Sequence, residues 1–366
     1  MERTELGQLL LVGVPGAELD LETATLFRRI QPGGFILFGR NIKSPKQLRQ
    51  FIDDLRDLSS REPIVGIDQE GGRVSRLKMI GNEPPNAQQL RLKGDESLIR
   101  QHGRLTGELL RIFGFNLDLC PVLDISFDDE ADNSLRGRCW GTGVSQVVQF
   151  AGAFNRELVS AGVLTCGKHF PGYAGAGLDP HHDLPVISRT KADLESCELA
   201  IFRQFVDEVS AMMVGHAWYP AFDQEKVPAS LSANVIQGLL KSELKYDGLV
   251  MTDDLDMGAA INSAGFDETI PKAITAGSDM VMICHRVNLA EQAYYLLTRL
   301  EPEITDRALA SVTKLKSRLA PPTQFSEARF QELDRQVWNL RVATLGEERA
   351  AQRSPDDGKR SPVEMY

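Results

Sequence analysis

Residues 164–172 read LTCGKHFPG, a short apolar run that ends in polar and turn-forming residues. The same order recurs along the chain, and most of the runs are continuously apolar rather than alternating. That pattern is typical of parallel strands buried on both faces. The strands we predict are Gln8–Val14, Gly34–Phe38, Ile64–Ile67, Asn116–Val122, Leu164–Lys168, Met212–His216, Gly248–Thr252 and Met280–Cys284.

Longer stretches with helical periodicity separate these strands. Ser44 followed by Pro45 gives one of them an N-cap and a proline at the first helical position. Alternating strands and helices predict a parallel sheet, and eight strands favour a closed (β/α)8 TIM-like barrel over an open sheet. The other helices we predict are Glu96–Phe113, Val144–Ala161, Ala192–Ser210, Ala233–Lys245 and Leu289–Leu300.

A single domain accounts for most of the chain. Barrels of this class reach such a length as one domain, and we expect the barrel to occupy residues 1–320. Pro321-Pro322 precedes a helical stretch, residues 321–345, that we expect to pack on the outside of the barrel. Residues 346–366 are polar, and we predict a disordered tail there.

Composition excludes several classes of function. The formal net charge is −10, so there is no basic surface of the kind that binds nucleic acid. No stretch approaches the roughly 20 apolar residues of a membrane span. The run Leu9–Val14 is too short for a signal peptide, and the five cysteines have no C-x-x-C spacing. We therefore expect a cytoplasmic protein with buried thiols and with neither a nucleic-acid nor a membrane partner.

Polar residues collect where the apolar runs end. In a β/α barrel the C-terminal strand ends open onto one face, where active sites lie. Each ending alone has an ordinary explanation, such as a helix cap at Asp253 or Asp254. Five together indicate a pocket. The five endings are Asp68-Gln69-Glu70, Lys168-His169, Gly215-His216, Thr252-Asp253-Asp254 and Cys284-His285.

A set of motifs between Gly33 and His285 has a recognisable order. The motifs are GGFILFGRNIKSP, VGIDQEGGRVSRL, RCWG, CGKHFPG, LDPHHDLP, PASLSANVIQGLL, YDGLVMTDDLDMGA and AGSDMVMICH. In this set the chain resembles the single-domain β-N-acetylglucosaminidases of glycoside hydrolase family 3, the type that acts in bacterial cell-wall recycling. The resemblance implies a retaining hydrolase of terminal β-linked N-acetylglucosamine on peptidoglycan-derived fragments. We expect a monomer or weak dimer that needs no metal and no cofactor.

The resemblance assigns catalytic roles to three residues. Asp253 falls on the family's nucleophile, a carboxylate that attacks the anomeric carbon and forms a glycosyl-enzyme. Asp179-Pro180-His181 matches the family's D-x-H acid/base pair. A histidine with a pKa of roughly 6.5 can protonate the leaving oxygen and later deprotonate water. His182 is the competing candidate, one residue out of register.

The same resemblance implies a set of sugar-binding residues. Carboxylates accept hydrogen bonds from sugar hydroxyls, while lysine and arginine donate them. His216 matches a strand-end histidine that lines the pocket in the family, and a buried structural histidine is an equally good interpretation. The residues implied to hold the non-reducing sugar are Asp68, Arg76, Arg138, Lys168 and His169.

The chain departs from the family pattern on one loop. Tyr173-Ala174-Gly175 replaces a run such as H-G-D, and Pro180 replaces a small polar residue. Both changes put aglycone preference and closure of the loop that carries His181 in doubt. Family 3 β-glucosidases commonly take their acid/base from an additional domain, and we predict none here, which favours the N-acetylglucosaminidase branch.

Three alternatives stay open. The first is a phosphorylase of the same fold, because a neutral histidine does not repel an incoming phosphate. The second is an inactive sugar-binding barrel, for which only Tyr173 and Pro180 speak. The third is a metal-dependent barrel hydrolase, although no H-x-H lies on an early strand. Its ligands would be His169, His181, His216, His285 and Asp253.

Overall fold

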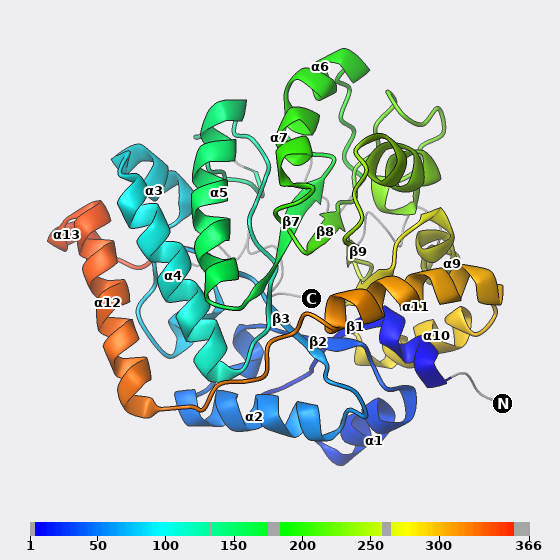
Figure 1. Ribbon diagram of the computed structural model, residues 1–366, viewed down its shortest axis with the longest axis horizontal. Helices are drawn as coiled ribbons and strands as arrows, with labels where there is room; N and C mark the ends of the chain where they lie inside the picture. The colour runs from blue at the N-terminus through cyan, green and yellow to red at the C-terminus, as the bar shows by residue number, and fades with distance from the viewer. Residues whose placement is uncertain (1–3, 132, 175–183, 258–264, 355–366) are drawn as a thin grey trace.

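The computed structural model describes residues 4–131, 133–174, 184–257 and 265–354. Eight parallel strands close into a barrel in the order β1-β10-β9-β8-β7-β6-β3-β2, with helices around the outside (Figure 1). This confirms the predicted (β/α)8 barrel, and each predicted strand overlaps an observed one. The strands are β1 (Leu10–Gly13), β2 (Gly34–Leu37), β3 (Ile64–Ile67), β6 (Leu117–Asp118), β7 (Leu164–Phe170), β8 (Ala211–Val214), β9 (Leu249–Asp254) and β10 (Met280–Ile283).

Strand β6 is much shorter than the predicted Asn116–Val122. Pro121 has no N–H to donate to a neighbouring strand, so regular pairing stops before it. The chain rejoins β7 only through an isolated bridge between Val122 and Lys168. A short antiparallel hairpin, β4 (Gln69–Gly71) with β5 (Val74–Ser75), follows β3 at the open end of the barrel.

The helices follow the predicted pattern with one interruption. Ser44 caps α2 by accepting from the Gln47 N–H, and the predicted helix from Glu96 to Phe113 is observed with the same bounds. The predicted helix Ala192–Ser210 is broken at Cys197. The helices are α1 (Leu21–Ile30), α2 (Pro45–Asp57), α3 (Ala87–Lys93), α4 (Glu96–Phe113), α5 (Val144–Ser160), α6 (Lys191–Ser196), α7 (Glu198–Phe205), the π-helical η5 (Asn234–Glu243), α9 (Phe266–Ala276), α10 (Val287–Leu297), α11 (Pro302–Lys316), α12 (Glu327–Leu345) and α13 (Glu347–Ala350), with short 3-10 turns η1 (Thr4–Leu9), η2 (Gly39–Asn41), η3 (Arg76–Met79) and η4 (Ala229–Leu231).

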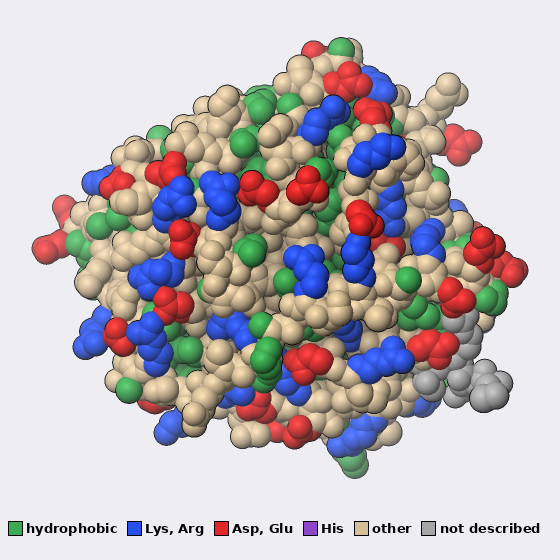
Figure 2. Space-filling view, in the orientation of Figure 1, with side chains coloured by type: hydrophobic (Ala, Val, Ile, Leu, Met, Phe, Trp, Pro, Cys, Tyr) green, Lys and Arg blue, Asp and Glu red, His purple; other side chains and the backbone are tan. Residues whose placement is uncertain are grey.

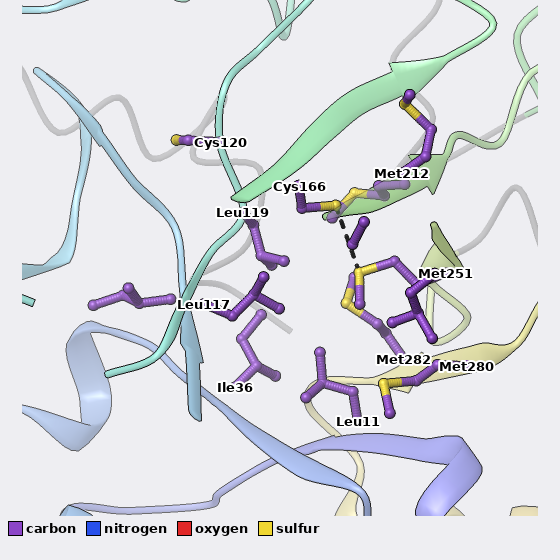
Figure 3. Close-up of a cluster of buried hydrophobic side chains, with 14 of the residues drawn as sticks. Leu11, Ile36, Leu117, Leu119, Cys120, Cys166, Met212, Met251, Met280 and Met282 are labelled. Atoms are coloured by element: carbon purple, nitrogen blue, oxygen red, sulfur yellow. Dashed lines mark hydrogen bonds between the residues drawn. The ribbon is translucent and has the colours of Figure 1, made fainter. Parts of the chain in front are cut away.

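The lower barrel interior is apolar and closed to water. Side chains from neighbouring strands meet there, among them Leu11, Ile36, Leu117 and several methionines (Figure 3). The Cys166 thiol lies 3.7 Å from the Met251 sulfur. Flexible thioethers fill irregular gaps well. The buried side chains therefore close the barrel interior below its open end. All five cysteines are free, as predicted.

Helix α12, in the predicted C-terminal helical stretch, packs on the barrel's outer layer along α4 (Figure 1). The Phe330 ring lies 5.5 Å from that of Phe113. The prediction of a disordered tail is wrong for residues 347–354, which form α13 and a short extension. Arg341 donates to Glu83 Oε1 over 2.9 Å, and Ser354 Oγ donates to the same oxygen over 2.7 Å.

Charges of both signs are mixed on the molecular surface. Lys and Arg side chains alternate with Asp and Glu side chains on the face shown in Figure 2. Within the described parts of the chain, every helix is too short or too polar to cross a membrane.

Candidate active site

Five buried charged residues meet at the barrel mouth, the face onto which the C-terminal strand ends open. Lys168 Nζ, at the end of β7, lies 2.7 Å from both Asp68 Oδ1 and Glu70 Oε1. Arg138 grips Glu70 with two hydrogen bonds, of 2.8 and 2.7 Å, and Arg76 lies 3.4 Å from Asp68. These five residues, hereafter the charge network, bring together four of the predicted sugar-binding residues and add Glu70.

The opposite charges of the network stabilise one another's ionised forms. Burial alone would raise the pKa of Glu70, but Arg138 and Lys168 outweigh it and hold that pKa far below its ordinary value. Burial likewise opposes the charge on Lys168, and Asp68 and Glu70 raise its pKa. Both carboxylates and the lysine are therefore ionised at neutral pH. Removing water from such charges is costly unless each is paired, so the geometry is held tightly.

Asp118 lies beneath the charge network, at the end of β6. Burial raises its pKa to about 7. Its Oδ1 accepts from the Gln69 N–H over 3.0 Å, and its Oδ2 is buried with no hydrogen-bond partner in the described residues. A carboxyl group in this position titrates near neutral pH, directly under the groups implied to hold the sugar.

A second cluster lies beside the network and involves His169. Its Nδ1 lies 2.7 Å from Asp124 Oδ2, and the other Asp124 oxygen accepts from the Tyr173 N–H over 2.6 Å. Asp124 therefore fixes the orientation of the imidazole and keeps Nδ1 occupied. Within the described residues, Nε2 has no hydrogen-bond partner and is available to a ligand.

His216 is fully buried under Tyr173. Its backbone N–H donates to the Tyr173 hydroxyl, and its ring nitrogens contact Ser230 Oγ at 2.7 Å and the Asp254 carbonyl at 2.9 Å. Both ring nitrogens are thus used within the protein. Of the two interpretations of this residue, the geometry favours the structural one, in which His216 supports the pocket from below.

The two aspartates that end β9 have different surroundings. Asp254 accepts from the Cys284 N–H over 3.1 Å and the Asp256 N–H over 3.0 Å. Burial first, and then the nearby Asp256 charge, raise its pKa well above the ordinary value. Asp253 is half-buried, and its Oδ1 accepts from the Asp254 N–H over 2.8 Å. Asp254 therefore links β9 to β10, while Asp253 is the partly exposed carboxylate at the mouth.

Asp179 and His181, with the rival His182, lie outside the described residues. The flanks of their segment are both attached at the mouth. The Gly172 carbonyl accepts from the Tyr219 hydroxyl over 2.6 Å. On the other side, the Ile187 N–H donates to the Trp218 carbonyl over 2.9 Å. Neighbouring residues of one loop thus hold both ends of the stretch that includes the predicted acid/base.

The described histidines among the metal-ligand candidates contact other protein groups, and His216 and His285 both contact Asp254. His285 Nδ1 lies 3.1 Å from Arg40 Nη1, whereas His169 and His216 bind the groups described above. In residues 4–131, 133–174, 184–257 and 265–354, no group of three or more His, Cys, Asp and Glu side chains is arranged to hold a metal ion.

Sequence reasoning missed the roles of Glu70, Asp124 and Tyr173. Glu70 belongs to one of the polar strand endings, but nothing in its local sequence shows that it bridges Lys168 and Arg138. Asp124 follows the predicted strand Asn116–Val122, so the same rule of polar residues after strands points to it. Tyr173 was noted only as a departure from the family pattern, yet it covers Gly215, where a Cβ would lie 2.6 Å from its ring.

The protein is a closed (β/α)8 barrel with a half-buried carboxylate and a buried charge network at its C-terminal mouth, the face where barrels of this architecture carry their active sites. Residues 1–315 match the family described as "Glycosyl hydrolase family 3 N terminal domain". The chain belongs to glycosyl hydrolase family 3.

Three relatives show the extent of the similarity. A protein named beta-hexosaminidase from Vibrio cholerae is 33% identical, over 92% of this chain and 96% of its own length. The solved structure of a family 3 beta-N-acetylglucosaminidase from Paenibacillus sp. strain FPU-7 is 31% identical, with a TM-score of 0.85 over 94% of this chain and 69% of that one. A family 3 glycosyl hydrolase structure from Mycobacterium smegmatis is 28% identical, with a TM-score of 0.78 over 88% and 98% of the two chains.

Proposed function

We propose that the protein is a retaining exo-β-N-acetylhexosaminidase that removes terminal β-linked N-acetylglucosamine. The observation that carries the proposal is that the half-buried Asp253, at the end of β9, and the buried charge network lie at the same mouth of the barrel. The names of the relatives from Vibrio cholerae and Paenibacillus sp. support the same activity.

In this proposal the charge network binds the non-reducing sugar. Asp68 accepts hydrogen bonds from sugar hydroxyls, and Lys168 and Arg76 donate to hydroxyl oxygens. His169 offers Nε2, since Asp124 already occupies Nδ1. Because the network is held by internal ion pairs before the sugar arrives, little reorganisation is needed on binding.

The chemistry has two steps. Asp253 attacks the anomeric carbon, the bond from that carbon to the leaving oxygen breaks, and His181 gives its proton to that oxygen. A water molecule then attacks the same carbon and gives a proton to His181, and the ester bond to Asp253 breaks. Asp179 fixes the tautomer of His181 and stabilises the imidazolium. The sugar is released with its original anomeric configuration.

The substrate we infer is a peptidoglycan-derived fragment in the cytoplasm. Such fragments present a terminal N-acetylglucosamine, which the proposed exo-acting enzyme would remove one residue at a time. The family resemblance points to this class of substrate. We further propose that the barrel, over residues 1–320, is the catalytic domain, and that the protein acts on carbohydrate as a monomer or weak dimer without a metal or another cofactor.

A panel of aryl β-glycosides tests the activity. We expect turnover of the N-acetylglucosaminide to exceed that of the glucoside and the xyloside. The panel is run with and without inorganic phosphate, and the products are identified. Free N-acetylglucosamine in both buffers supports the hydrolase, whereas a sugar 1-phosphate as the main product would establish the phosphorylase alternative.

A further inference from the structure

A hollow of about 420 Å³ lies beside the barrel mouth and is lined by five arginines. It is formed by the loop after β3, the loop after β6 and the C-terminal helices α12 and α13. Helix α12 runs along α4, with α13 and α3 at the same end of the molecule (Figure 1). The five arginines, which define the arginine hollow, are Arg73, Arg136, Arg341, Arg349 and Arg353.

The positive charge of the arginine hollow is only partly compensated. Arg341 is paired with the buried Glu83, and Arg136 forms an exposed pair with Glu130 at 2.9 Å. Within the described residues, Arg349 and Arg353 have no acidic side chain within ion-pair distance, and no aspartate or glutamate lines the hollow. Arg353 Nη2 donates a long hydrogen bond of 3.5 Å to the Gly81 carbonyl, which leaves most of the N–H donors of the two guanidinium groups for an anionic ligand.

The other lining groups suit a polar ligand. Asn86, Gln88 and Gln89, at the start of α3, contribute amides, and Ser354 contributes a hydroxyl. Guanidinium groups bind carboxylates through two parallel hydrogen bonds, a geometry that a flexible amine cannot provide. The combination fits a peptide with carboxylate groups better than it fits a neutral sugar.

One backbone carbonyl connects the arginine hollow to the charge network. The Ser134 oxygen accepts from Arg73 Nη2 over 2.5 Å and from Arg138 Nη1 over 3.1 Å. Arg73 lines the hollow, while Arg138 holds Glu70 in the network. The two sites therefore lie on either side of the loop that carries Ser134, which places the hollow next to the mouth.

We infer that the arginine hollow binds carboxylate groups carried on the aglycone, which makes it a subsite for an acidic peptide attached to the leaving sugar. This inference rests on the proposed glycosidase function. The neutral sugar is held by the charge network, and the acidic peptide is held by Arg349 and Arg353. Specificity for charged over neutral aglycones then comes from a part of the chain that lies beyond residues 1–315.

The test compares two substrates of the full-length protein. The acidic one is N-acetylglucosamine β-linked to a muramyl tripeptide, and the neutral one is its analogue with every carboxylate converted to an amide. For Arg349→Ala/Arg353→Ala we expect the ratio of the acidic to the neutral KM to rise about fivefold to tenfold. We expect the wild type to have a lower KM for the acidic substrate than for the neutral one. This difference in KM shrinks at high salt, because exposed charges are screened.

A matched control removes two arginines elsewhere on the surface. Arg299→Ala/Arg335→Ala makes the same change of net charge at exposed positions outside the hollow, and its KM ratio stays that of the wild type. Equal ratios in all three proteins would overturn the inference, as would an equal change in both double variants. Calorimetric titration with the acidic aglycone alone measures the subsite without turnover. Loss of its binding in Arg349→Ala/Arg353→Ala supports the subsite, even if an inactive wild type disproves the glycosidase.

Discussion

Lys168 at the end of β7 donates a 2.7 Å hydrogen bond to Asp68 at the end of β3, although 100 residues separate them in the sequence. Strand β6 lies between the two strands in the barrel, so the bond spans the mouth rather than joining neighbouring strands. It holds two of the groups implied to bind the sugar in a fixed relative position before any ligand is present.

Replacing Lys168 with methionine tests this arrangement. The change removes one cation and leaves two buried carboxylates without it, so we expect the free energy of unfolding to fall by about 3–5 kcal/mol. We expect kcat/KM for an aryl N-acetylglucosaminide to fall at least about 100-fold, because a direct donor to the sugar is lost. Urea denaturation and steady-state kinetics measure the two effects.

Lys241→Met is the control for that variant. Lys241 forms an ion pair of 2.9 Å with the buried Asp279, which lies just before β10, at the opposite end of the strands from the mouth. This variant should lose stability and keep kcat/KM. A similar loss of kcat/KM in both variants would mean that the effect of Lys168→Met comes from stability alone.

Asp253→Asn removes the proposed nucleophile with little change in shape. We expect turnover of an aryl N-acetylglucosaminide to fall by about 10⁴-fold or more, with an unchanged unfolding midpoint. Asp254→Asn is the matched variant. Its amide oxygen can still accept from the Cys284 and Asp256 N–H groups, and we expect it to keep most activity. If the order of the two variants is reversed, Asp254 is the reacting carboxylate.

The barrel could be predicted because each strand is a continuous apolar run, and parallel strands with both faces buried require such runs. The strand ends then placed Lys168 and Asp68 at one mouth by topology alone. Which side chains pair across the mouth depends on the directions in which they point in three dimensions. The ion pairs of Glu70 with Lys168 and Arg138 could therefore not be predicted from its neighbours in sequence.

The C-terminal segment shows the same limit. The polar composition of residues 346–366 predicts disorder, but residues 347–354 are attached through Arg341 of α12. Its guanidinium donates to the Ala350 carbonyl over 2.9 Å and forms a buried ion pair with Glu83, 258 residues away in the sequence. Composition reports whether a segment can form its own core. It does not report whether a single charged side chain will find a buried partner elsewhere.

His181→Ala separates acid catalysis from other roles of the loop. A substrate with a poor leaving group needs protonation of the departing oxygen, whereas a dinitrophenyl glycoside does not. We expect kcat/KM to fall about 100-fold or more for the poor leaving group and far less for the activated one. His182→Ala is the control for the register. If His182→Ala shows the selective loss and His181→Ala does not, the assignment of the acid/base moves by one residue.

Asp118 predicts a specific pH dependence of stability. Burial raises its pKa to about 7 in the folded protein, compared with roughly 3.9 in an unfolded chain. Between these values the folded state binds the extra proton, so the free energy of unfolding falls as pH rises from about 4 to about 7 and then levels off. The contribution of this one group is on the order of 4 kcal/mol at most.

Asp118→Asn isolates this contribution. The variant keeps an oxygen to accept from the Gln69 N–H and cannot titrate, so its difference from wild type removes the effect of all other groups. We expect the variant to gain stability relative to wild type between pH 4 and pH 7, measured by urea denaturation at intervals of half a pH unit. A difference that stays constant over this range would mean that Asp118 is already ionised in the folded protein at pH 4. Lys168 would then have to compensate its charge together with those of Asp68 and Glu70.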